Sequence, residues 1–170
     1  MFPTPHVTNL RSHAIQTFGE QRVNAFKDFL FRKLSRNDFH LKSFPFSAQA
    51  KTANKRLLGV KDIPIEKIIG TVGRNGDFDY CFRPLKSHLR DRWSNVFINV
   101  HENGWPPIIV RAVEGQYYVE DGHHRTSIAC ALDMSFIQAE VWEYTIPLSI
   151  TTLDEWQECA LENICEACPA

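Results

Sequence analysis

The sequence predicts an α+β domain in which a small mixed sheet is flanked by helices. Short apolar runs lie on either side of Glu114-Gly115, a two-residue hairpin signal. Apolar and polar residues alternate over residues 137–142, as they do in a half-buried strand. Apolar residues recur at helical spacing in residues 11–34 and 87–100. The chain has 170 residues, of which 44% are hydrophobic, and this suits one domain with an appended helical piece.

Composition and charge exclude several classes of protein. The net charge of −1 gives the whole chain no general attraction for nucleic acid, although a local basic patch stays open. No apolar run approaches the roughly 20 residues that span a bilayer. Residues 1–10 lack the charged and apolar regions of a signal peptide. We therefore expect a cytoplasmic protein with no membrane partner.

The cysteines do not predict a disulfide framework, because they are an odd set in a compartment expected to be reducing. They are Cys81, Cys130, Cys159, Cys165 and Cys168. The last two form a lone CxxC pair. A zinc site needs about four ligands, and no second pair is present, so free thiols are the expectation.

Residues 1–60 are expected to form an N-terminal helical extension docked on the core. Residues 11–34 have an amphipathic helical pattern, with Gly19 as a candidate kink. Residues 37–46 predict a loop. Residues 47–58 predict a second, short helix that ends at a glycine.

Residues 61–146 are expected to form the core of the domain. Residues 63–69 predict its first strand. Residues 87–100 predict a helix that places Trp93 in the core and ends at Asn103-Gly104. The hairpin described above follows.

A last strand and a C-terminal piece complete the prediction. The strand begins near Met134. Residues 147–170 are assigned to a C-terminal helix and tail. Thr152 and Glu155 form a capping-box signature, which predicts a helix over residues 153–164.

The stretch from residue 118 to 132 has the pattern of a phosphate-binding turn. A strand end is followed by Gly122 and by three basic side chains, and a helix is predicted from Thr126. The N–H groups at a helix start and the helix dipole attract anions. Arg125 can add a bidentate contact, and a histidine can add a donor. The alternative is an ordinary strand-to-helix turn with surface histidines.

Two boxes of this sequence resemble the ParB/sulfiredoxin superfamily. Residues 121–125, Asp-Gly-His-His-Arg, are similar to its second box, Gly-x-His-Arg at a helix start. Residues 63–68 followed by residues 70–74 resemble the first box of ParB-like domains, an Ile-Pro-x-x-x-Ile strand that leads to an arginine. The resemblance covers residues 62–144, and the fuller pattern is similar to a DGHHR branch of ParB-like proteins.

The resemblance implies a ParB/sulfiredoxin-like fold with a nucleotide bound between the two boxes, namely ATP, ADP or CTP. Carried over position by position, it implies that these residues contact the nucleotide: Gly73, Arg74, Gly122, His123, His124, Arg125 and Thr126.

Phosphoryl chemistry on such a nucleotide would need charge neutralisation by Mg²⁺ and a group that orients the nucleophile. Asp77 and Asp79 are the candidate metal ligands, because carboxylate oxygens suit Mg²⁺. Plain turn chemistry is the alternative for this pair. The expected catalytic residues are Asp121, His124 and Arg125.

Departures from the superfamily narrow the expected activity. His123 occupies the position of the sulfiredoxin cysteine, which argues against sulfinic-acid reduction. Arg74 stands near the position of a glutamate in the free-serine kinases, which argues against a small-metabolite kinase. ParB clamps continue into a helix-turn-helix and a dimerisation domain, and only the short segment 147–170 follows the core here, so specific centromere-site binding is not expected.

Three function classes remain. The first is a nucleotide-binding protein that hydrolyses or transfers a terminal phosphate with Mg²⁺. The second is a metal-dependent ParB-like nuclease, in which the candidate carboxylates, Glu120 among them, hold a metal and Arg125 holds the scissile phosphate. The third is a non-catalytic module that binds DNA or nucleotide and regulates. The sequence leaves open the base, the phosphate acceptor and the oligomeric state.

Overall fold

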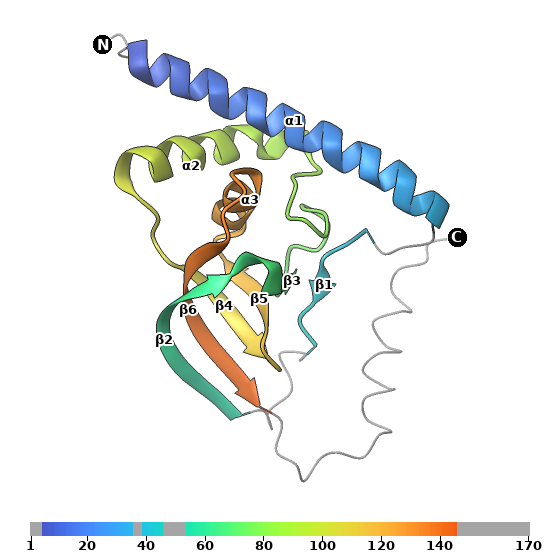
Figure 1. Cartoon of the computed structure of the whole chain (residues 1–170), viewed down its shortest axis with the longest axis vertical. Coiled ribbons are helices and arrows are strands. Elements are labelled where there is room, and N and C mark those ends of the chain that lie inside the picture. Colours follow the sequence, from blue (N-terminus) through green and yellow to red (C-terminus); the bar gives the residue numbers. More distant parts are fainter. Residues whose placement is uncertain (1–4, 36–38, 46–53, 146–170) are drawn as a thin grey trace.

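The fold is centred on one six-stranded mixed sheet with the strand order β1-β3-β5-β4-β6-β2 (Figure 1). The computed structural model describes residues 5–35, 39–45 and 54–145. Its elements are α1 (Pro5–Ser35), β1 (Lys42–Ser43), β2 (Asn54–Pro64), β3 (Ile68–Thr71), α2 (Arg90–Asn103), β4 (Ile108–Val113), β5 (Gln116–Asp121), α3 (His123–Ala131) and β6 (Phe136–Thr145), with short 3₁₀ turns at Ile65–Lys67 and Ser87–Leu89.

The sheet mixes both kinds of strand pairing. β3 pairs in parallel with β1 and β5, and β4 pairs in parallel with β6. The β4–β5 and β2–β6 pairs are antiparallel. The predicted α+β class with a mixed sheet is therefore confirmed. No helix among the described residues is long and apolar enough to cross a membrane.

The helices are layered beside the sheet. Figure 1 shows α3 between α2 and the strands, with the long α1 lying across the outer side of α2. The core lies between these layers, and Trp93 of α2 is fully buried in it, as predicted. The indole Nε1 of Trp93 donates to Ser127 Oγ of α3 at 3.0 Å. This bond fixes α2 against the helix that carries the candidate phosphate turn.

Local signals predicted several elements correctly. Glu114 and Gly115 have φ values of 51° and 76°, which is the backbone of a type I′ hairpin turn. α2 ends at Gly104, which has a φ of 85°. β6 covers the alternating segment. α3 begins at His123, three residues earlier than predicted, because Gly122 takes the cap position.

The predicted helix over residues 47–58 is wrong where the structure describes it. Residues from Asn54 onward belong to β2, which pairs with β6 along its length. Pairing with a strand some 80 positions away overrides the local helical preference here. The expected domain boundary at residue 60 falls inside β2. Residues 47–53 lie outside the described residues.

The predicted strand over residues 63–69 is also wrong as a single element. Ile63 belongs to β2 and Ile68 belongs to β3, and a 3₁₀ turn separates the two strands. β2 and β3 occupy distant positions in the sheet order. The predicted loop over residues 37–46 contains the two-residue strand β1. The predicted helix over residues 153–164 lies outside the described residues.

α1 docks through a different face from the one that its large apolar residues suggest. It runs unbroken through Gly19. Ala14, Phe18 and Ala25 are buried, and the Phe18 ring meets Trp93 edge-on with 5.7 Å between centroids. Small residues let the two helices approach closely. Most of the large apolar residues of α1 remain exposed.

Candidate functional site

The candidate site lies where β5 turns into α3. Gly122 caps the helix in the left-handed region, with φ 97° and ψ 19°, and no side chain caps the helix there. The first helical hydrogen bond runs from Thr126 N to Gly122 O at 2.9 Å. The N–H groups of the residues between them have no acceptor within the helix, so they can receive an anion.

A pocket with a cavity volume of about 180 Å³ opens at this helix start. Its lining comes from the 72–86 loop, α2, the end of β5 and the start of α3: Arg74, Arg92, Val96, Asp121, Gly122, His123, His124 and Arg125. The lining thus includes three arginines and one carboxylate, which makes the pocket strongly cationic.

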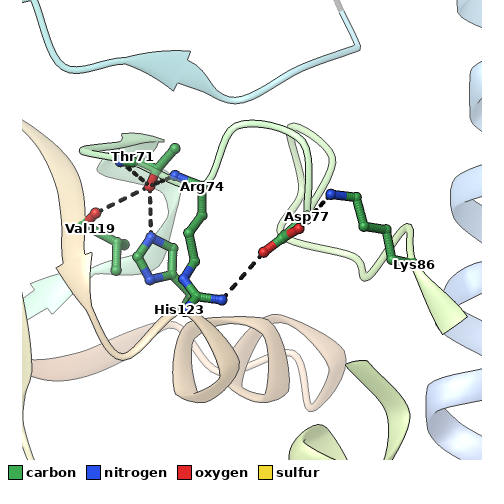
Figure 2. A network of polar contacts seen from close by, with 7 residues as sticks. Thr71, Arg74, Asp77, Lys86, Val119 and His123 are labelled. Carbon is green, nitrogen blue, oxygen red and sulfur yellow. Dashed lines mark hydrogen bonds and ion pairs between the residues drawn. The ribbon is translucent and has the colours of Figure 1, made fainter. Parts of the chain in front are cut away.

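His123 is held by a hydrogen-bond network centred on Thr71. Its Nε2 lies 2.6 Å from the Thr71 Oγ1, which also accepts the backbone N–H groups of Gly73 and Arg74 at 3.2 Å each. Figure 2 shows these contacts converging on the hydroxyl, with Val119 on its other side. The network ties the 72–86 loop to α3 and thereby sets the position of Arg74.

His124 is buried without a hydrogen-bond partner. Neither ring nitrogen has one among the described residues, although the side chain is only 6% exposed. Its ring meets Phe78 edge-on, with 5.5 Å between centroids. Buried polar atoms are nearly always hydrogen-bonded. Since His124 lines the pocket, its unpaired nitrogens are placed to bond a group that enters the pocket, whether water or a ligand.

Both histidines are neutral near pH 7 in this arrangement. Burial and the charge of Arg74 lower the pKa of His123 to about 4. Burial and the charges of Arg92 and Arg74 lower the pKa of His124 to about 4 as well. The cationic side chains that would attract an anion therefore also suppress the charge of the histidines until the anion arrives.

The arginines of the pocket are not equivalent. Arg92 is exposed, and within the described part of the chain it has no ion-pair or hydrogen-bond partner. Arg74 makes one 3.3 Å contact with Asp77 and is 41% exposed. Both therefore retain donors for a ligand. The sequence did not assign Arg92 to the site, because only the packing of α2 against α3 brings it there.

Arg125 is largely engaged by the protein itself. Its Nη1 donates to the carbonyl oxygens of Pro106 and Pro107 at 2.8 and 2.5 Å, and its Nη2 donates to Asp121 at 2.9 Å. It fastens the segment before β4 to α3. Asp121 is 64% exposed and is the carboxylate of the pocket lining.

Two of the expected nucleotide contacts are not brought into the pocket. Both donors of Thr126 bond back to Gly122 O, so the expectation that Thr126 donates to a ligand is not supported by its geometry. Gly73 does not line the pocket, and a Cβ built on it would meet nothing within 4 Å.

Asp77 and Asp79 do not fit the expected magnesium site. Asp79 is fully buried and accepts the N–H groups of Cys81 and Arg83 at 3.0 and 2.8 Å and the Arg83 Nε at 2.7 Å. Burial raises the pKa of Asp79 even so. The plain-turn alternative describes this residue.

The neighbouring acids are also paired. Asp77 is held by Lys86 at 2.9 Å and by Arg74 (Figure 2). Burial alone would raise the pKa of Asp77, but Lys86 and Arg74 hold it below its usual value. Glu120 receives two hydrogen bonds from Arg111. Among the described residues, no group of three or more His, Cys, Asp or Glu side chains is placed to hold a metal ion.

Gly122→Ala is expected to destabilise the fold. A left-handed backbone costs a non-glycine residue about 1–2 kcal/mol. The new Cβ would also lie 2.5 Å from Ile108 Cγ2 of β4, so the loss should exceed that range. Urea unfolding followed by circular dichroism measures it. Gly73→Ala is the matched control, because its Cβ meets open space; equal stability of the two variants would contradict the tight turn.

Comparison with known proteins gave no relative for this chain. No protein-family model, no curated protein and no solved structure matches it.

Proposed function

We propose that this protein binds a phosphate-bearing ligand, of the nucleotide class, in the pocket at the start of α3. The observation that carries the proposal is His124, whose two buried nitrogens lack partners in a pocket lined by arginines. A phosphate group offers the oxygen acceptors and the negative charge that this lining lacks. The resemblance of the two boxes to the ParB/sulfiredoxin superfamily extends the proposal from phosphate to nucleotide.

Each part of the pocket has a separate task in binding. The N–H groups of the first turn of α3 donate to phosphate oxygens without any side-chain rearrangement. Arg74 and Arg92 supply charge from two other elements. His124 donates one hydrogen bond and accepts a proton as the phosphate approaches, because a nearby anion favours the imidazolium.

The proposal covers binding without a resident metal, because the acids expected to hold Mg²⁺ are engaged elsewhere. Asp121 is the carboxylate on which turnover of a terminal phosphate would depend. It is paired with Arg125 at 2.9 Å, so it can orient a group on the ligand only by sharing or breaking that pair.

Arg92→Ala should weaken binding by about tenfold, which corresponds to the loss of about 1.4 kcal/mol of charge interaction at an exposed site. Arg90→Ala is the matched control, because Arg90 lies on the same helix, is exposed and does not line the pocket. Isothermal titration with ATP, ADP, CTP and inorganic phosphate, each with Mg²⁺ and with EDTA, measures the affinities.

The panel also tests the ligand class. Binding of phosphate but of no nucleotide would restrict the proposal to a phosphate site. Absence of binding by the wild type at millimolar concentrations of every ligand, or equal affinities in the Arg92 and Arg90 variants, would overturn it. Phosphate release that Asp121→Asn abolishes would add turnover to binding.

A further inference from the structure

Thr71 is fully buried at the end of β3, and four polar groups surround its hydroxyl (Figure 2). The backbone N–H groups of Gly73 and Arg74 each lie 3.2 Å from Oγ1. The Nε2 of His123 lies 2.6 Å from Oγ1, and the carbonyl oxygen of Val119 lies 3.3 Å from it. A hydroxyl has one proton to donate and two lone pairs with which to accept. The role of each contact can therefore be assigned.

The assignment follows from the groups that can only donate. The backbone N–H groups of Gly73 and Arg74 have no other role open to them, so they occupy the two lone pairs of the hydroxyl. Its proton is left for Nε2 of His123 or for the Val119 carbonyl, and the contact with Nε2 is much the shorter. A protonated Nε2 would be a third donor to an oxygen whose lone pairs are already used. Nε2 is therefore the acceptor, and the ring proton of neutral His123 is on Nδ1.

The Nδ1–H group of His123 belongs to a ring that lines the pocket. The ring is stacked on Phe78, with 6.2 Å between centroids and an interplanar angle of 18°. The nearby carbonyl oxygen of Val119 already accepts the N–H of Val72 at 2.9 Å. Within the described part of the chain, Nδ1 makes no hydrogen bond of its own. A donor in this position is suited to an oxygen atom that enters the pocket.

We infer that Thr71 is a positioning residue of the phosphate site: its hydroxyl holds His123 as the Nδ1–H tautomer, so that a neutral N–H group donates to the bound phosphate. The inference rests on the proposed function for the identity of the ligand. The same hydroxyl accepts the backbone N–H of Arg74. One buried side chain thus positions two donors of the pocket, of which one is neutral and one is charged.

His123 and His124 therefore act differently on the same ligand. His124 has no partner, so it can take up a proton when phosphate binds. An imidazolium donates from both nitrogens, so His123 can be protonated only by giving up the hydrogen bond from Thr71. The charged groups that act on its ring come from the 72–86 loop and from β5: Arg74, Asp77 and Asp121. Burial and Arg74 outweigh the two acids and lower the pKa of His123 to about 4. The contribution of His123 to affinity should therefore be the same at pH 6 and at pH 8.

Nitrogen-15 NMR of the ligand-free full chain tests the tautomer, because protonated and unprotonated ring nitrogens resonate far apart. At pH 7 the wild type should show a protonated Nδ1 and an unprotonated Nε2 for His123, and the loss of these signals in His123→Gln assigns them. Thr71→Val keeps the shape of the side chain without the hydroxyl, so His123 should become a mixture of tautomers. Thr71→Ser keeps the hydroxyl and should restore the wild-type spectrum. A purely structural role of Thr71 would leave the tautomer unchanged.

Isothermal titration with inorganic phosphate tests the contact with the ligand. Thr71→Val should lower the affinity about tenfold at both pH 6 and pH 8, the effect of losing one hydrogen bond to a charged group. Thr71→Ser should bind like the wild type. The Nδ1 signal of His123 in the wild type should shift on saturation with phosphate. Urea unfolding shows whether Thr71→Val is folded, and the measurements on the wild type and Thr71→Ser do not depend on that variant.

The outcomes separate this inference from the proposed function. A proton on Nε2 of His123 in the ligand-free wild type would overturn the inference, and so would a Thr71→Val variant that keeps both the tautomer and the affinity. An Nδ1 signal that does not move in the phosphate-saturated protein would overturn the contact with the ligand. A wild type that binds no phosphate would overturn the proposed function together with that contact, while the tautomer of the ligand-free protein would still decide the role of Thr71.

Discussion

Replacing Asp79 by alanine lowers the expected free energy of unfolding by about 3–5 kcal/mol, the cost of breaking a buried ion pair from one side. The carboxylate is fully buried and receives three hydrogen bonds, two from backbone N–H groups and one from Arg83. Its loss leaves those donors unpaired and the guanidinium, which is 14% exposed, without its buried partner. Chemical denaturation at pH 7 measures the change.

The same network explains why the loss should extend beyond the loop. Arg83 also donates to Asp28 of α1 at 2.6 Å, and the Tyr80 hydroxyl donates to the same carboxylate at 3.0 Å. The Asp79–Arg83 pair thus joins the 72–86 loop to the long helix. Loosening it should increase hydrogen exchange in both.

Asp91→Ala is the control for this variant. Asp91 also pairs with an arginine, at 3.3 Å, but the two side chains are 72% and 56% exposed. Such surface pairs contribute about 0–1 kcal/mol. Comparable losses in the Asp79 and Asp91 variants would show that the buried network does not stabilise the fold.

Asp77 and Asp79 also show where sequence reasoning fails. An Asp-x-Asp pattern in a loop has the same spacing whether it binds a metal or closes a turn. The difference lies in the partners, and Arg83, Lys86 and Arg74 become partners only through the path of the loop. The sequence pattern does not distinguish a metal site from a closed turn, and the tertiary contacts of the two aspartates favour the turn.

The elements that were predicted correctly have local causes. The hairpin turn needs positive φ at Glu114 and Gly115, and its signal lies within two residues. β2 was missed because its cause is remote: it exists by pairing with β6. The strand-to-helix turn at Gly122 was predicted because Gly122 and the residues after it are adjacent in sequence. Arg92 was missed because it reaches the pocket from another helix.

His124→Ala is expected to weaken phosphate binding several-fold at pH 6 and by less at pH 8, because a charge-assisted hydrogen bond raises the pKa of His124 in the complex by only about one to two units. A charge-assisted hydrogen bond contributes about 1.5–3 kcal/mol, and each 1.4 kcal/mol is a factor of ten in affinity. The unliganded protein holds the pKa of His124 at about 4, so the ring is neutral before binding. A bound phosphate raises that pKa, and binding therefore takes up a proton.

The sign of the pH dependence follows from this uptake. Between the pKa of the unliganded state and the higher pKa of the complex, each unit of rising pH lowers the affinity, by up to tenfold. The variant has no such proton to take up. The ratio of wild-type to His124→Ala affinity should therefore fall from pH 6 to pH 8, and ionisation of the phosphate cancels in the ratio.

The lowered pKa values of the two histidines also set the lowest pH at which binding can be measured without a large loss of stability. His123 and His124 take up protons more readily unfolded than folded, since their pKa values of about 4 lie below the ordinary 6.5. Their contribution to stability is complete above pH 6.5 and is lost progressively as the pH falls toward 4. Titrations at pH 6 and above therefore keep most of this contribution.

Isothermal titration in two buffers of different ionisation enthalpy measures the proton uptake directly. His88→Ala is the matched control, because His88 is exposed and lies outside the pocket lining. It should bind and take up protons like the wild type.

His123→Ala should lower stability, because it removes the contact with Thr71 that ties the 72–86 loop to α3. A wild-type to His124→Ala ratio that stays constant from pH 6 to pH 8, with no proton uptake on binding, would place His124 outside the ligand contacts and leave its buried nitrogens unexplained.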